Sequence, residues 1–278
     1  MINYTTKYFD LKILKLSEIK LHELTEYNRL RNIFGRINKD KMLMNPVIVG
    51  KVKNDFILLD GANRYSSLKD LKCKLIIAQI INYNDERIKL KKWNHLIYNI
   101  EIEKFISYCK RNNIRQKEIS YQEGLNYVRN KFGNILISEV KNGKNILIHL
   151  DKNFDNMINQ IDRLTRIYFN KYNFDRSECE INFNDLRKFS RKKGILIEFP
   201  DFTKKHIIKA ANSLNKIPSG ITRHLIVNRV LHIRYNIKNL IDENEIGRKS
   251  IELEKFLLGK IDNNKVRQYK ESVIVFDE

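Results

Sequence analysis

Residues 56–70 read Phe-Ile-Leu-Leu-Asp-Gly-Ala-Asn-Arg-Tyr-Ser-Ser-Leu-Lys-Asp, and this stretch decides the fold. Its apolar beginning has the composition of a β-strand, and Tyr65, Leu68 and Leu71 follow the Asp-Gly pair at helical spacing. A helix that opens on a glycine turn directs several backbone N–H groups toward one point, and the helix dipole favours an anion there. The stretch therefore predicts a strand-turn-helix unit with an anion site at the turn.

Two charged side chains of this stretch suit a phosphate site. Arg64, in the first turn of the expected helix, carries a forked cationic donor that matches phosphate oxygens. Asp60, at the carboxyl end of the expected strand, can hold a magnesium ion or accept a proton. The same pattern also occurs as a plain tight turn with a capping aspartate, so the residues alone leave both interpretations open.

The segment 59–65, Leu-Asp-Gly-Ala-Asn-Arg-Tyr, resembles the D-G-x-H-R-Y box of the ParB/sulfiredoxin-like nucleotide-binding fold. Sulfiredoxins carry a reactive cysteine in this box, whereas this chain has Ala62 and Asn63 there, so their reductase chemistry is not expected. Asn63 also stands where the usual histidine would be, which puts any role of that histidine in doubt. The resemblance implies a nucleotide-binding set made of Gly61, Ala62, Asn63, Arg64 and Tyr65.

Composition indicates a globular protein without membrane spans. The 278 residues suffice for one large or two modest domains, and 3 prolines and 10 glycines argue against long disordered linkers. No apolar run reaches the roughly 18 residues that a membrane helix needs, and the first residues do not resemble a signal peptide. Cys73, Cys109 and Cys179 lie far apart and form no metal-binding pattern. We therefore expect reduced thiols, a cytoplasmic location and no membrane partner.

The net charge of +20 admits two explanations. A strongly basic protein suits a polyanionic partner, so DNA binding through a basic surface is one hypothesis. The chain is also rich in Lys, Ile and Asn together, which is the bias of an AT-rich coding sequence, and its lysines are spread along the chain. The charge alone does not decide between these explanations.

The sequence predicts an α+β protein of two domains. The first, residues 1–85, is expected to be the ParB/sulfiredoxin-like nucleotide-binding domain, with strands at 11–16, 46–49, 56–59 and 75–81 and helices at 24–33 and after the Asp-Gly pair. The second, residues 86–278, is expected to be an α+β domain that packs across a cleft and completes the substrate pocket.

In the second domain, apolar spacing and turn residues predict the following elements. Helices are expected at 87–111, 117–131, 153–170, 185–192, after 200 and at 246–259. Strands are expected at 134–140, 145–149, 194–199, 221–224, 231–234 and 271–276. The turn 141–144 predicts a hairpin, and we expect 231–234 to pair with 221–224.

Two short segments carry side chains that can either bind a ligand or serve the fold. Glu23 follows His22 at the start of an expected helix, where a surface carboxylate is also favoured by the helix dipole. Trp93, the only tryptophan, stands between charged residues and can be a packing anchor or lie over a ligand.

A third segment, 217–224, reads Ile-Pro-Ser-Gly-Ile-Thr-Arg-His. It places a hydroxyl, a guanidinium and an imidazole in a row after a Pro-x-Gly loop, and these groups suit a carboxylate or phosphate. In a regular strand Thr222 and His224 would share one face while Arg223 would point the other way.

Taken in order, L-H-E-x5-R-L at 21–30, the Asp-Gly-x-x-Arg-Tyr box, W-x-H at 93–95 and P-x-G-x-T-R at 218–223 resemble the free serine kinases. The siderophore-associated branch, which makes O-phospho-L-serine, is the most similar. The resemblance extends from about residue 11 to about residue 240.

This resemblance implies a division of labour among the residues. Glu23 falls on the catalytic glutamate, the general base toward the serine hydroxyl, and Asp60 on the acidic residue beside the nucleotide phosphates and metal. The positions that line the amino-acid pocket correspond to Trp93, Gly220, Thr222, Arg223 and His224. The implied partners are free L-serine, Mg²⁺ and a nucleotide donor, with ATP favoured over ADP. A ParB-like, nucleotide-dependent DNA-binding regulator is the alternative.

Overall fold

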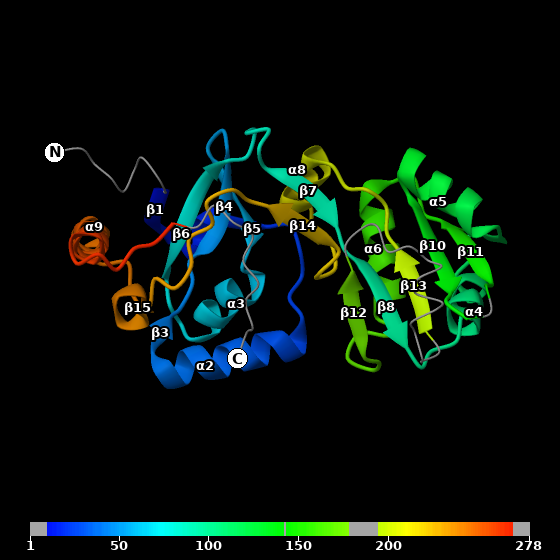
Figure 1. Ribbon diagram of the computed structural model, residues 1–278, viewed down its shortest axis with the longest axis horizontal. Helices are drawn as coiled ribbons and strands as arrows, with labels where there is room; N and C mark the ends of the chain where they lie inside the picture. The colour runs from blue at the N-terminus through cyan, green and yellow to red at the C-terminus, as the bar shows by residue number, and fades with distance from the viewer. Residues whose placement is uncertain (1–9, 142, 178–193, 269–278) are drawn as a thin grey trace. The chain divides into compact units, whose positions relative to one another are not determined.

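The computed structural model describes residues 10–141, 143–177 and 194–268, which form two compact units (Figure 1). Residues 10–19, 32–85 and 226–268 make the first unit, and residues 20–31 and 86–225 make the second, apart from those not described. One boundary between the units lies after residue 85, and the chain returns to the first unit after residue 225. The helix expected at 185–192 and the strand expected at 271–276 lie outside the described residues.

The first unit is built on a mixed five-stranded sheet with the order β1-β6-β4-β5-β2. Its strands are β1 Asp10–Lys15, β2 Ile19–Leu21, β4 Val47–Val52, β5 Asp55–Asp60 and β6 Leu75–Asn82. β4 pairs antiparallel with β5 and parallel with β6, and β1 pairs antiparallel with β6. Residues 47–49 of β4 and 75–78 of β6 are almost fully buried, as expected for central strands.

Helices and a small ladder complete this unit. α3 Ala62–Asp70 follows β5 directly, and α9 Ile246–Asp262 packs against β1 (Figure 1). β3 Met42–Leu43 pairs with β15 Tyr235–Asn236, and short 3-10 turns lie at Leu16–Glu18 and Ile237–Leu240. α2 Tyr27–Asp40 runs from the second unit's residues into the first.

The second unit contains a six-stranded antiparallel sheet with the order β12-β8-β13-β10-β11-β9. Its strands are β8 Asn94–Tyr98, β9 Gln116–Glu118, β10 Asn134–Glu139, β11 Asn145–His149, β12 Phe174–Ser177 and β13 Gly194–Glu198. Its helices are α4 Glu103–Arg111, α5 Tyr121–Asn130, α6 Phe154–Thr165 and α8 Lys204–Asn212. A separate two-stranded ladder joins β7 Lys89–Lys92 to β14 Thr222–Leu225.

Most expected elements are confirmed within a few residues, and so is the α+β class. The hairpin around residues 141–144 forms as β10 and β11. No helix in the described ranges is long and apolar enough to cross a membrane. Cys73 and Cys109 are buried free thiols, and burial raises the pKa of both. Cys179 lies outside the described residues.

Three expectations about secondary structure are wrong. Residues 89–98 form two strands, not the first half of a helix, because a short apolar run such as Asn94–Tyr98 fits a buried strand as well as a helix. Residues 116–118 form the edge strand β9, and the helix starts only after Ser120, whose hydroxyl caps it. Residues 231–234 do not pair with 221–224, because β14 pairs with β7 instead.

A buried carboxylate stands at the end of β13. Glu198 is 5% exposed, and its Oε2 has no hydrogen-bond partner within the described residues. Burial raises the pKa of Glu198 to about 7, although the Lys92 charge and a hydrogen bond from Tyr121 act in the opposite direction. The protonated form is therefore favoured by folding.

We predict that Glu198→Gln removes a pH-dependent loss of stability. Because the folded pKa lies above the unfolded value, the stabilisation is complete below about pH 4.5 and is lost as the pH rises through about 7. The amide should make the protein more stable than wild type at pH 8, by up to about 3 kcal/mol. Denaturant unfolding of both proteins from pH 4 to 8 measures the difference. Parallel curves across this range would contradict the prediction.

Candidate functional site

The Asp-Gly turn between β5 and α3 has the predicted form, and it requires glycine at position 61 for two reasons. Gly61 is the N-cap of α3 and has φ +101°, in the left-handed region that disfavours other residues. A Cβ built there would lie 2.8 Å from Arg64 Nη2 and 2.8 Å from Val47 Cγ1. The turn thus brings the Arg64 side chain close over the backbone where the helix presents its first N–H groups.

Asp60 lies between two arginines. Arg64 Nη2 donates to Asp60 Oδ2 at 2.5 Å, and Arg229 Nη2 pairs with the same oxygen. Burial alone would raise the pKa of Asp60, but the two guanidinium charges outweigh it and hold that pKa below its usual value. The side chains of Asp60, Arg64 and Arg229 are 36%, 17% and 42% exposed, so the cluster is accessible to a ligand.

The other residues of the box differ in role. Ala62 is buried, and Asn63 is partly exposed. Tyr65 is 7% exposed, and its hydroxyl donates to the Leu16 carbonyl at 3.0 Å. Tyr65 N donates to the Gly61 carbonyl at 2.9 Å, so this residue anchors α3 through both its backbone and its side chain.

In the second unit, the segment around Glu23 runs beside the loop before β14. Glu23 forms a parallel bridge with Ile217, in which Leu24 N donates to the Ile217 carbonyl at 2.8 Å. Ile217 N in turn donates to the His22 carbonyl at 2.9 Å. Two motifs that are far apart in the sequence are thus hydrogen-bonded to each other.

The side chains of β14 alternate as the sequence predicts. Thr222 and His224 are buried, and His22 Nε2 lies 3.2 Å from Thr222 Oγ1 across 200 residues of sequence. The His22 and His224 rings meet edge to face, with centroids 5.5 Å apart. Arg223 points the other way, and its guanidinium carbon lies 4.4 Å from the centre of the Trp93 ring.

Gly220 is held by His95, the histidine of the W-x-H motif. His95 Nε2 lies 2.8 Å from the Gly220 carbonyl and Nδ1 lies 2.6 Å from the Tyr168 hydroxyl. A carbonyl can only accept, so Nε2 carries a proton. Burial lowers the pKa of His95 to about 3, so the ring is neutral and Nδ1 accepts from the Tyr168 hydroxyl.

Glu26 and Arg176 form an ion pair that packs against the same loop. The sequence did not predict this pair. Arg176 Nη2 donates to Glu26 Oε2 at 2.5 Å, and both side chains are largely buried. The Arg176 guanidinium lies so close to Gly220 that an added Cβ would come within 2.2 Å of its Nε. Glu26 stands at an unspecified position of the L-H-E-x5-R-L motif and Arg176 lies outside all four motifs, so the sequence did not indicate their pairing.

The predicted site residues therefore form two groups. Asp60, Gly61 and Arg64 gather at one turn of the first unit, with Arg229 as an additional member. In the second unit, hydrogen bonds join the Glu23 segment to the loop that leads through Gly220 to Thr222, and Trp93 stacks on Arg223.

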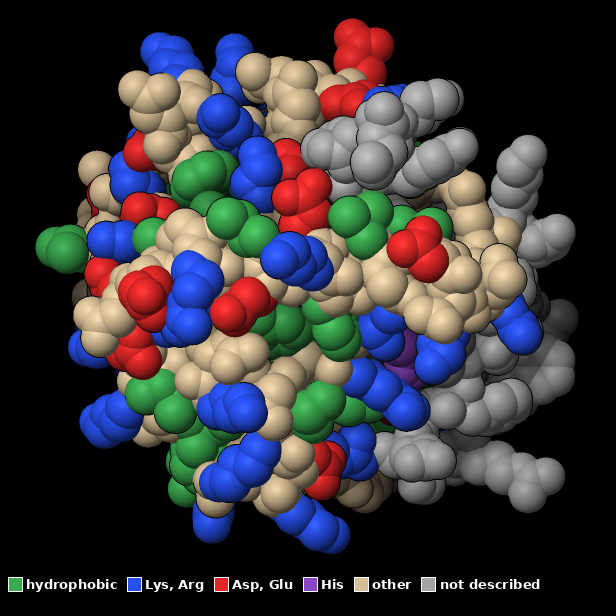
Figure 2. All heavy atoms as spheres, turned by 90° about the vertical axis from the view of Figure 1, so that its left-hand side faces the viewer, with side chains coloured by type: hydrophobic (Ala, Val, Ile, Leu, Met, Phe, Trp, Pro, Cys, Tyr) green, Lys and Arg blue, Asp and Glu red, His purple; other side chains and the backbone are tan. Residues whose placement is uncertain are grey.

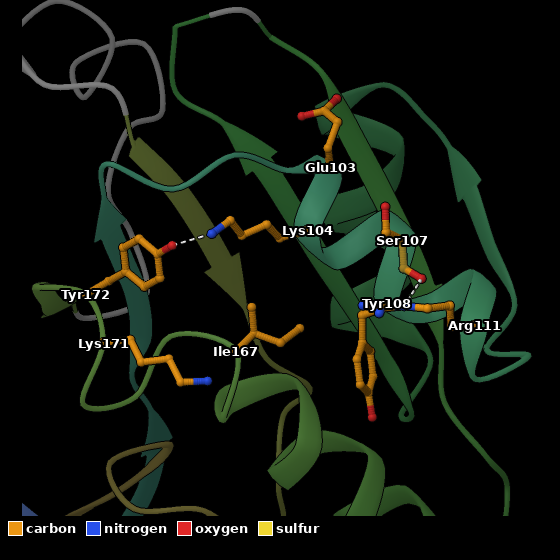
Figure 3. A pocket seen from close by; sticks show the side chains of 8 residues that line it. All are labelled: Glu103, Lys104, Ser107, Tyr108, Arg111, Ile167, Lys171 and Tyr172. Atoms are coloured by element: carbon orange, nitrogen blue, oxygen red, sulfur yellow. Dashed lines mark hydrogen bonds between the residues drawn. The ribbon is translucent and has the colours of Figure 1, made fainter.

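A surface pocket of about 470 Å³ lies elsewhere on the second unit, and none of the predicted site residues lines it (Figure 3). Its walls come from α4 and the segment after α6, and include Glu103, Lys104, Ser107, Tyr108, Arg111, Ile167, Lys171 and Tyr172. Its basic side chains bond to uncharged groups of the protein: Lys104 to the Tyr172 hydroxyl, Arg111 to the Ser107 carbonyl and Lys171 to the Arg166 carbonyl.

No cluster of three or more His, Cys, Asp or Glu side chains that could hold a metal occurs in the part of the chain that the structure describes.

Searches with this sequence identify relatives of known activity, although no family model matches the chain. The "ATP-dependent L-serine kinase" of Staphylothermus marinus is 28% identical over 114 residues, 40% of this chain and 45% of the relative. The kinase SbnI of Staphylococcus aureus is 31% identical over 88 residues, 31% of this chain and 34% of SbnI. A "ParB-like protein" of Sulfolobus acidocaldarius is 30% identical over 97 residues, 35% of this chain and 45% of that protein. The matches thus span less than half the length of these relatives.

Structural comparison covers far more of the chain. A C-terminally truncated SbnI from Staphylococcus aureus superposes with a TM-score of 0.73 and 18% identity, over 94% of this chain and 100% of that chain. A free serine kinase in complex with AMP superposes with a TM-score of 0.69 and 14% identity, over 83% of this chain and 93% of that chain. This protein has the fold of the free serine kinases. The expected resemblance to them is confirmed.

We predict that Gly220→Ala destabilises the protein, by about 1–3 kcal/mol. The substitution forces a residue with a Cβ into a left-handed conformation, φ +73°, and drives that Cβ into Arg176. Gly259→Ala, inside α9 with open space around it, is the matched control and should stabilise by about 0.5–1 kcal/mol. Chemical unfolding of the three proteins gives both values. Equal loss in the two variants would show that crowding at Gly220 is not the cause.

Proposed function

We propose that this protein is a small-molecule kinase that transfers a phosphoryl group from a nucleotide, ATP in preference to ADP, to the hydroxyl of free L-serine, giving O-phospho-L-serine. The observation that carries the proposal is the hydrogen-bonded pairing of the Glu23 segment with the loop and strand that hold Gly220 and Thr222. The motifs implied for the base and for the amino-acid pocket therefore belong to one place. The serine kinase names of the relatives and the AMP-bound structural neighbour support it.

The nucleotide phosphates are assigned to the turn after β5. Gly61 begins α3, whose amino end favours an anion, and the Arg64 guanidinium lies close to Gly61. The phosphate oxygens would compete with Asp60 for the arginine, since both are anionic acceptors for the same guanidinium. Ala62 and Asn63 take part through this end of the helix, while Tyr65 holds the helix in place.

Asp60 is the residue that would hold Mg²⁺ together with the phosphates. A single carboxylate fits this role, because Mg²⁺ usually binds through one or two carboxylates plus substrate phosphates and water. When bound, the ion neutralises charge on the transferring group. The low pKa of Asp60 keeps the carboxylate ionised and available at neutral pH.

The acceptor is assigned to the second unit. Glu23 would take the proton of the serine hydroxyl as the bond to phosphorus forms. Arg223, oriented by the Trp93 ring, can bind the carboxylate of the amino acid. Thr222 and His224 are buried and bonded within the protein, so we assign them to shaping the pocket.

Incubation with γ-labelled ATP, Mg²⁺ and L-serine tests the proposal directly. Labelled O-phospho-L-serine is the expected product, with threonine and homoserine as competing acceptors and ADP as the competing donor. If ATP is bound but no hydroxylated amino acid is phosphorylated, the kinase assignment is wrong.

Glu23→Gln should lower turnover by about 10²–10⁴ while the affinity for nucleotide stays the same. The amide keeps the size of the side chain but cannot accept the proton, and a general base is worth about that factor. Steady-state kinetics and calorimetric titration with ATP separate the two effects. Weakened ATP binding with normal turnover would instead make Glu23 a nucleotide contact.

Arg223→Ala should raise the KM for serine about ten- to a hundredfold and leave the KM for ATP nearly unchanged, because one charge-assisted contact is worth about 1.5–3 kcal/mol. Arg248→Ala, on the exposed surface of α9, is the control for loss of one positive charge. A defect confined to the KM for ATP would remove Arg223 from the amino-acid pocket.

The net charge of +20 and the ParB-like relative favour a second candidate function, nucleotide-dependent DNA binding. On the face drawn in Figure 2, Lys and Arg side chains are interspersed with Asp and Glu side chains. Binding of duplex DNA at 150 mM salt, with and without ATP, tests this function. Affinity that depends on neither sequence nor nucleotide would reflect charge alone.

A further inference from the structure

Gln79, on the central strand β6, makes an unusual pair of hydrogen bonds. Gln79 is 3% exposed, so its amide is removed from water. Nε2 donates to the Asn228 carbonyl at 2.9 Å, and Oε1 accepts from Val230 N at 3.0 Å. The amide therefore binds the backbone of residues 228 and 230 as a neighbouring strand would, through one donor and one acceptor.

The residue between these two bonds is Arg229. The segment from 226 to 234 has no regular secondary structure, so its position depends on such contacts. Two further bonds hold its later part, from His232 N to Asn45 Oδ1 at 2.7 Å and from Arg234 N to the Met44 carbonyl at 3.3 Å. Gln79 is the side chain that fixes the backbone on both sides of Arg229.

Fixed in this way, Arg229 pairs with the same Asp60 oxygen as Arg64. Two guanidinium groups on one carboxylate leave an excess of one positive charge at the amino end of α3. The Arg229 side chain is 42% exposed, so its guanidinium can also contact an anion that enters from solvent. The cluster is therefore prepared for a second anion with several oxygens, which is the chemistry of a di- or triphosphate.

We propose that Arg229 is a second phosphate-binding arginine of the nucleotide site and that Gln79 is its positioning residue. This inference rests on the proposed function, in that it assigns the anion to the phosphates of ATP. Arg229 lies 165 residues after Arg64 in the sequence, and no sequence motif includes it.

Calorimetric titration with ATP, in the absence of serine, tests the inference. Arg229→Ala should weaken ATP binding about ten- to a hundredfold, because a charge-assisted contact to phosphate is lost. Gln79→Ala should weaken it about three- to thirtyfold by releasing the segment. In the double variant, the loss should equal that of Arg229→Ala alone, because Gln79 acts only through the arginine.

Control variants separate this effect from a general disturbance of the loop. Arg234→Ala removes an exposed charge from the same segment, and Gln268→Ala removes an amide whose Nε2 lies 3.3 Å from the Asn228 side chain. Both should bind ATP within about twofold of wild type. If Gln79→Ala does not fold, Gln79→Glu takes its place. This variant keeps the size and the acceptor but loses the donor to the Asn228 carbonyl, and it should weaken ATP binding by the same three- to thirtyfold.

Two results would overturn the inference. One is ATP binding by Arg229→Ala that equals wild type. The other is a loss from Gln79→Ala that is equally large with and without Arg229, which would mean that Gln79 merely stabilises the fold. These outcomes are distinct from failure of the kinase proposal, in which wild type binds ATP but phosphorylates no amino acid.

Discussion

The left-handed turn at Gly61 is the constraint on which the first unit's site depends. Any side chain at this position would meet Arg64 and Val47 and would also strain the backbone. Because the turn is tight, a residue at the end of β5 and a residue in the first turn of α3 can pair directly, as Asp60 and Arg64 do. The backbone conformation thus determines where the charges lie, and the pKa of Asp60 follows from those charges.

In the second unit, the site depends on a loop that is held in one conformation. Two residues from distant parts of the sequence support the loop through Gly220. Neutral His95 holds the Gly220 carbonyl, and Arg176 is held under the loop by Glu26. His95 is hydrogen-bonded at both ring nitrogens, and since a buried polar group without a partner costs about 1–3 kcal/mol, these bonds favour one arrangement of the loop.

The sequence predicts well whatever depends on neighbouring residues. The Asp-Gly turn, its strand and its helix are local, and so is the alternation that turns Arg223 away from Thr222. The resemblance to serine kinases also follows from short motifs kept in order. What the sequence does not predict is pairing between distant segments. Residues 94–98 become a strand because β13 and β12 flank them, and no local pattern separates that outcome from a buried helix.

Arg229 shows why the site itself is harder to predict than the fold. It lies in an irregular segment among apolar and basic residues, so neither periodicity nor a motif marks it. Its role depends on Gln79, a polar residue inside an otherwise apolar strand, where polar side chains are costly unless both ends are bonded. A buried polar residue in a central strand thus indicates that another segment docks on that strand, because its burial is unfavourable unless that segment supplies hydrogen-bond partners. In this protein the segment that docks there carries the arginine.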